Sequence, residues 1–223
     1  KIQNTINKTN PYVYPATDWY DMLFKDYSNN HRLNFNLSGG GKVTRYYLAG
    51  SVINDNGVLN VDNKNNFNNN VQLNRYMLRS NVNINVTPTT EAIVRLSGAF
   101  DDYKGPPQGG QRIFQMVMHT NPVLFPPYYA PDAANEYTEH ILFGNYDNMQ
   151  YYNPYAEMVR GYKEYSESQM GAQFELKQDL EFIMEGLSFR AMFNTNRYSY
   201  FDVVRQYDPF YYTVGSYNKG KDT

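Results

Sequence analysis

Polar and apolar side chains alternate along six stretches of this chain, and the six stretches form three consecutive pairs. The pairs are residues 31–38 with 45–53, 76–86 with 91–100, and 170–177 with 187–197. Alternation with a period of two is typical of a β-strand that has one apolar and one polar face. The sequence therefore predicts an all-β fold in which six strands are arranged as three hairpins.

The alternation also predicts which side chains share a face. The residues expected on the apolar face are Leu33, Phe35, Leu37, Val82, Ile84, Val94, Leu96, Phe174, Leu176, Phe189 and Phe193. The residues expected on the opposite face are polar, namely Arg32, Asn34, Asn36, Arg79, Asn81, Asn83, Arg95, Arg190 and Asn194. A soluble β-sandwich also alternates in this way, so the pattern alone leaves two architectures open.

The connections between the stretches are of two kinds. Short turns are expected at residues 39–44, 87–90 and 183–186, where Gly39, Gly40 and Gly41 would supply positive φ, and long loops at 54–75 and 101–169. Strands of about ten residues joined by short turns on one side and long loops on the other are typical of an antiparallel transmembrane β-barrel. In that architecture the apolar face contacts lipid and the polar face lines a water-filled lumen.

Six strands are fewer than the roughly eight of the smallest bacterial barrel, so we expect a piece of a larger one. No apolar h-region of a signal peptide is visible in the first residues, which fits a mature form or an internal piece. Within the piece, the sequence predicts an irregular lead-in at 1–30, barrel hairpins over 31–215 and the start of a further loop at 216–223. A short helix is expected within 154–162, inside the proline-rich loop.

Composition excludes several other classes. Mean hydropathy is −0.69 and no apolar run approaches the ~18 residues that a spanning helix needs. The formal net charge of −2 gives no basic surface for nucleic acid. The chain has no cysteine, which excludes disulfides, thiolate metal sites and cysteine nucleophiles. Aromatic residues nevertheless make up 17% of the chain, and there are 28 asparagines.

The candidate motifs for catalysis or metal binding each lack a required residue. The segment 39–44 lacks the glycine and the hydroxyl residue that a phosphate-binding loop requires around Lys42. Glu136, Glu139 and His140 lack the second histidine of a zinc-binding helix. We therefore expect no enzyme activity, no cofactor and no metal site.

An ordered set of segments points to a family. Asp18-Trp19-Tyr20 is followed by HRLNFNLSGGG, RYYLAGSVINDNGVL, RYMLRSNVNINVTPTTEA, NPYAEMVRGY and LSFRAMF. This order resembles the SusC/RagA-like TonB-dependent transporters over most of residues 18–200. The resemblance implies an outer-membrane barrel of 22 strands with an internal plug, energised by TonB through a region absent here. It also implies a SusD-like surface lipoprotein as a lid, and the import of oligosaccharides or oligopeptides.

Candidate contacts to the substrate or the lid lie in the long loop and at its entry. They are Asp101, Asp102, Tyr103, Tyr128, Tyr129, Tyr151, Tyr152 and Tyr155. Tyrosine rings stack on sugar rings with little loss of side-chain entropy, and asparagine both donates to and accepts from hydroxyl groups. These residue types favour an oligosaccharide over a peptide as the substrate. A secreted, soluble β-sandwich carbohydrate-binding module remains an alternative from another class.

Overall fold

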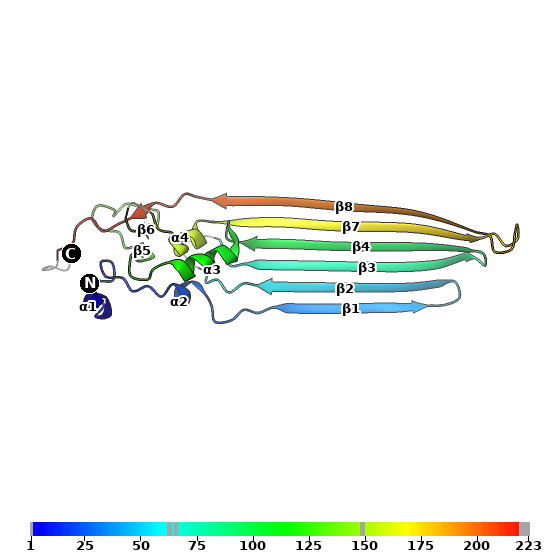
Figure 1. Cartoon of the computed structure of the whole chain (residues 1–223), viewed down its shortest axis with the longest axis horizontal. Coiled ribbons are helices and arrows are strands. Elements are labelled where there is room, and N and C mark those ends of the chain that lie inside the picture. Colours follow the sequence, from blue (N-terminus) through cyan, green and yellow to red (C-terminus); the bar gives the residue numbers. More distant parts are fainter. Residues whose placement is uncertain (1, 62–63, 65–66, 148–149, 219–223) are drawn as a thin grey trace.

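Three hairpins lie side by side and form one long antiparallel sheet (Figure 1). The computed structural model describes residues 2–61, 64, 67–147 and 150–218. The order of the strands is the order of the chain, β1-β2-β3-β4-β7-β8, so every strand pairs with the one before it in this sheet. The sheet is open, and β1 and β8 are its edges. Its strands are β1 (His31–Gly40), β2 (Thr44–Asn56), β3 (Gln72–Thr87), β4 (Thr90–Gly105), β7 (Gly161–Asp179) and β8 (Ser188–Gln206).

The six predicted strands are confirmed, but they are longer than predicted. β4 continues to Gly105 and β7 begins at Gly161, so the connection between them is 106–160 and not 101–169. The connection between β2 and β3 is likewise 57–71 and not 54–75. Residues 62, 63, 65 and 66 of this loop, and residues 219–223 of the predicted loop at 216–223, lie outside the described residues.

Two glycines of the first hairpin, Gly39 and Gly50, make space for aromatic side chains of the paired strand. Positive φ predicted for Gly39, Gly40 and Gly41 is wrong, because within the described ranges only Gly109 and Gly186 among the glycines have it. At Gly39, an added Cβ would lie 2.6 Å from the hydroxyl oxygen of Tyr46 on the neighbouring strand. At Gly50, an added Cβ would collide with the ring of Phe35. Both glycines therefore leave room for an aromatic ring from the paired strand.

The remaining elements gather at the end of the sheet opposite the hairpin turns (Figure 1). We call this part, the described residues of 10–30, 57–71, 106–160 and 207–218, the cap. It contains a small sheet in the order β5-β6-β9, formed by β5 (Tyr128–Tyr129), β6 (Leu142–Gly144) and β9 (Tyr211–Tyr212). Its helices are α2 (Trp19–Leu23), α3 (Gly109–His119) and α4 (Pro154–Val159), and α1 (Ile2–Ile6) precedes it.

The lead-in at 1–30 is thus not irregular throughout, because α1 and α2 interrupt it and α2 packs into the cap. The predicted helix within 154–162 is α4, which starts where its sequence specifies. Asn153 is its N-cap and accepts a hydrogen bond from the Ala156 amide, while Pro154 occupies the first turn. No helix in the described part of the chain is long and apolar enough to cross a membrane.

The hydrophobic core lies in the cap and not on the sheet. The buried cluster draws on four separate stretches of sequence, and its members are Trp19, Leu23, Phe24, Leu59, Ile113, Val117, Phe125, Phe143, Tyr155, Ala156, Met158 and Val159. Asn153 joins two of these stretches, because its side-chain amide donates to the carbonyls of Pro127 and Gly144. The loops of the sheet therefore fold together into one ordered body.

Candidate functional site

The registers assign every strand residue to one of two faces. Residues directly opposite each other in an antiparallel pair point to the same side, so the pairings can be followed across all six strands. The eleven residues predicted to be apolar-facing all lie on one side, which we call the apolar face. The nine predicted polar-facing residues all lie on the other side, the polar face.

Large side chains on the apolar face are exposed. Leu33 is 64% exposed, Leu96 50% and Phe193 65%, and no residue of this face belongs to the buried core of the cap. Burial of such side chains is the main driving force for folding and association. An apolar face of this extent marks a surface that contacts something apolar.

Near the hairpin turns, the polar face carries a chain of ion pairs that crosses the strands. Arg45 on β2 and Lys177 on β7 both pair with Glu91 on β4, at 3.0 and 3.2 Å between nitrogen and oxygen. The buried carboxylate of Glu175 is held by Arg95 at 3.1 Å and by Arg190 at 2.7 Å. This chain joins β2, β4, β7 and β8 through side chains alone.

Near the cap, the predicted contact residues Asp101, Asp102 and Tyr103 do not form one site. The Asp101 carboxylate receives two parallel hydrogen bonds from Arg75, with a shortest distance of 2.6 Å. Tyr103, also on the polar face, stacks on Tyr165 with ring centroids 4.7 Å apart. Asp102 lies on the opposite face, where its carboxylate accepts a hydrogen bond from the hydroxyl of Ser166. The paired acids therefore do not act together on one ligand.

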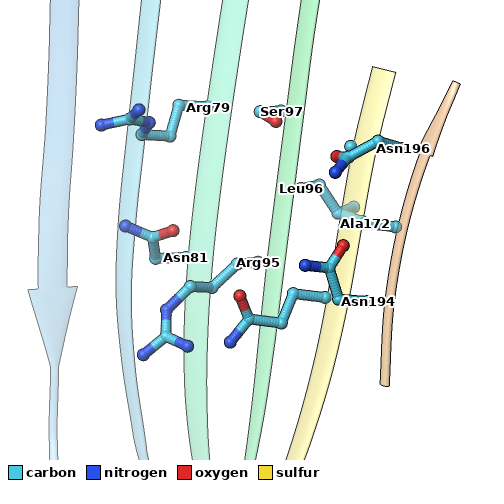
Figure 2. A pocket seen from close by; sticks show the side chains of 10 residues that line it. Arg79, Asn81, Arg95, Leu96, Ser97, Ala172, Asn194 and Asn196 are labelled. Atoms are coloured by element: carbon cyan, nitrogen blue, oxygen red, sulfur yellow. The ribbon is translucent and has the colours of Figure 1, made fainter. Parts of the chain in front are cut away.

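Between these two regions the polar face is hollowed. A hollow of about 300 Å³ opens here, and a second of about 550 Å³ adjoins it and shares part of its lining. Figure 2 shows the first hollow, with side chains from β3, β4, β7 and β8 around it. We call it the Arg79 hollow, and its polar lining includes Arg79, Asn81, Arg95, Ser97, Asn194 and Asn196.

Small residues create the hollow. One row of directly paired residues runs across all six strands, and it consists of Asn36, Ala49, Arg79, Ser97, Gly171 and Asn196. The residues on either side of Arg79 in this row are Ala49 and Ser97, and Gly171 follows. Their short side chains leave space above the sheet, and the longer side chains of the flanking rows form the walls.

The tyrosines predicted in the long loop have different environments in the cap. Tyr151 and Tyr152 are 42% and 66% exposed, and the guanidinium of Arg112 lies 5.1 Å from the Tyr152 ring centroid. The ring of Tyr128 carries the Lys64 ammonium above it, and burial raises the pKa of Tyr129 to about 12. Tyr155 differs from the other predicted tyrosines, because its side chain is 1% exposed and packs against Tyr128 and Phe143 in the core.

Alternation in the sequence placed Arg79, Asn81, Arg95 and Asn194 on the polar face, but it did not single out the hollow that they line. Ala49 and Gly171 carry no functional group, and their importance appears only once the register aligns them beside Arg79. Within the described ranges there is no group of three or more acidic or histidine side chains placed to hold a metal ion.

The geometry therefore offers two surfaces suited to ligand contact, the Arg79 hollow on the polar face and the exposed tyrosines of the cap. Neither is arranged as a nucleophile with a base, and both present hydrogen-bond donors, acceptors and rings. A comparison with known proteins adds no assignment to this geometry: no protein-family model and no curated protein matches the chain.

Proposed function

We propose that the six strands are part of the wall of an outer-membrane β-barrel, with the apolar face toward lipid and the polar face toward the lumen. The observation that carries this proposal is the exposure of a whole apolar face opposite a face rich in arginine, asparagine and ion pairs. In a soluble sandwich, the apolar face would be packed against a second sheet.

The dimensions of the apolar face support this placement. On β4 its side chains run from Ala92 to Phe100, roughly 27 Å along the strand at about 3.4 Å per residue. With the tilt of about 40° found in such barrels, this corresponds to about 20 Å of depth, close to the ~25 Å apolar band of an outer-membrane barrel. Beyond Phe100 the same face becomes polar, with Asp102 and an ion pair between Lys104 and Glu164.

The barrel is in turn proposed to be a TonB-dependent importer of the SusC-like kind, working with a SusD-like lipoprotein lid. The resemblance of the sequence to that family is the basis for this step. The cap, built from the loops at one end of the sheet, is placed on the extracellular side in this proposal. Its exposed Tyr151 and Tyr152 and the free amides of the polar face suit an oligosaccharide as the imported substrate.

Uptake by intact cells tests this function. Cells that make the full-length protein and its lid are given a labelled oligosaccharide panel and a labelled peptide panel, with and without an uncoupler of the proton gradient. We expect energy-dependent uptake of oligosaccharides, reduced about tenfold when Tyr151 and Tyr152 are both changed to alanine. Tyr137→Ala is the matched control, because this tyrosine is 91% exposed elsewhere in the cap.

The other outcomes separate the alternatives. Uptake of peptides alone would contradict the oligosaccharide as the substrate and would still support the transport function. A full-length protein that is secreted and stays soluble without detergent would contradict the transporter and favour a β-sandwich carbohydrate-binding module.

A further inference from the structure

Several polar side chains line the Arg79 hollow without forming hydrogen bonds to one another. The side chains of Arg79, Asn81, Ser97, Asn194 and Asn196 make no hydrogen bond or ion pair with any other residue in the described part of the chain. Figure 2 shows Arg79, Asn81 and Arg95 on one side of the hollow and Asn194 and Asn196 on the other. This differs from the regions on either side, where Arg45, Arg75 and Arg190 are all paired with carboxylates.

The charge of the hollow is positive. Two arginines line it, and neither its lining nor that of the adjoining hollow includes an aspartate or a glutamate among the described residues. The Arg95 charge is compensated by the buried Glu175. The Arg79 charge has no such partner within the described ranges. Arg79 lines both hollows, so an uncompensated positive charge lies where the two hollows adjoin.

The chemistry of these groups defines a ligand. A guanidinium presents a planar pair of donors that matches the two oxygens of a carboxylate. Asparagine amides and the Ser97 hydroxyl both donate and accept, as the hydroxyl groups of a sugar require. The two adjoining hollows together fall in the size range of small-molecule sites.

We propose that the Arg79 hollow is a subsite for an acidic oligosaccharide, with Arg79 binding the carboxylate of a uronic-acid unit and the surrounding amides binding its hydroxyl groups. This inference rests on the proposed function, because it names the substrate class of the same lumen. It makes Arg79 the residue that distinguishes acidic from neutral sugars.

Calorimetry on the full-length transporter with its lid tests the proposal. The probes are a short oligogalacturonate and its methyl ester, which has the same rings and hydroxyl groups but no charge. We expect the acid to bind at least about tenfold more tightly than the ester, since a hydrogen bond to a charged group is stronger than one to a neutral group. Arg79→Gln should remove this preference by weakening the acid alone, and Arg79→Lys should restore part of it.

The control is Arg205→Gln, which makes the same change of charge on the apolar face, near the cap. It should leave both affinities unchanged. Equal binding of acid and ester by the unaltered protein would overturn the acidic subsite while leaving oligosaccharide import in place. A second outcome would also overturn the acidic subsite. In it, Arg79→Gln binds both probes as tightly as the unaltered protein but unfolds at a lower temperature without ligand, which would give Arg79 a structural role. Failure of both probes to bind, with uptake of peptides, would overturn the proposed substrate class as well.

Discussion

At the scale of single residues, the two faces of β3 and β4 are proposed to contact different surroundings, lipid on the apolar face and water on the polar face. Leu96 is halfway along the apolar stretch of β4, and Asn83 lies on the polar face of β3. Leu96→Arg should cost about 2–4 kcal/mol, because a charge would be placed at the middle of the lipid layer. Asn83→Arg should change stability little. Urea unfolding of the full-length protein in lipid measures both, and equal costs would contradict the assignment of the faces.

A second residue-scale effect involves Glu157 in the cap. Its side chain is 9% exposed, and burial raises its pKa even though the Arg160 guanidinium lies 3.3 Å away. A carboxyl group whose pKa is raised on folding stabilises the fold below its unfolded pKa of about 4.3 and loses that contribution as the pH rises through the raised value.

We therefore expect Glu157→Gln to stabilise the cap relative to the unaltered protein at neutral pH, and to lose this advantage near pH 4. Hydrogen exchange of the amides of α4 across this pH range measures the difference. A difference that stays constant with pH would show that Glu157 does not titrate in this way.

At the scale of elements, the first hairpin depends on how its two strands interlock. The Phe35 ring covers Gly50 on the paired strand, so Gly50→Ala should force the ring away and cost about 1–3 kcal/mol. The same change in a Phe35→Leu background should cost less, because a smaller side chain leaves room for the methyl group. Limited proteolysis of the hairpin in both backgrounds measures this coupling, and equal costs would contradict it.

At the scale of elements, it is also clear which parts of the fold could be predicted from the sequence. The alternation of Leu33, Phe35 and Leu37 with asparagines was sufficient to predict β1 and its faces. The alternation did not predict the first half of β7. Residues such as Glu164 and Tyr165 make both faces of this part of the strand polar or aromatic, so no apolar face alternates with a polar one there. The Arg79 hollow could not be predicted, since it depends on the register that brings Gly171 and Ser97 into one row with Arg79.

At the scale of the whole molecule, the proposal fixes which end of the sheet faces the outside. The chain has no cysteine, so a single introduced cysteine provides a unique label. Tyr137→Cys in the cap should react with an impermeant reagent on intact cells, and Thr89→Cys in the turn between β3 and β4 should not. Asn66, an obvious alternative site in the first long loop, lies outside the described residues. The reverse labelling pattern would invert the topology.

The way the cap is put together has a consequence for the order of folding. Each hairpin of the sheet joins strands that are adjacent in sequence, and such local contacts form early. The cap core instead brings together three segments, which contribute Trp19 from the lead-in, Leu59 from the connection between β2 and β3, and Phe125 and Met158 from the connection between β4 and β7. Strands β1 to β4 separate these three segments along the chain, so we expect the segments to meet only after those strands have paired. We therefore expect protection of the Trp19 region from hydrogen exchange to be a late event, which would report that strands β1 to β4 are already in register.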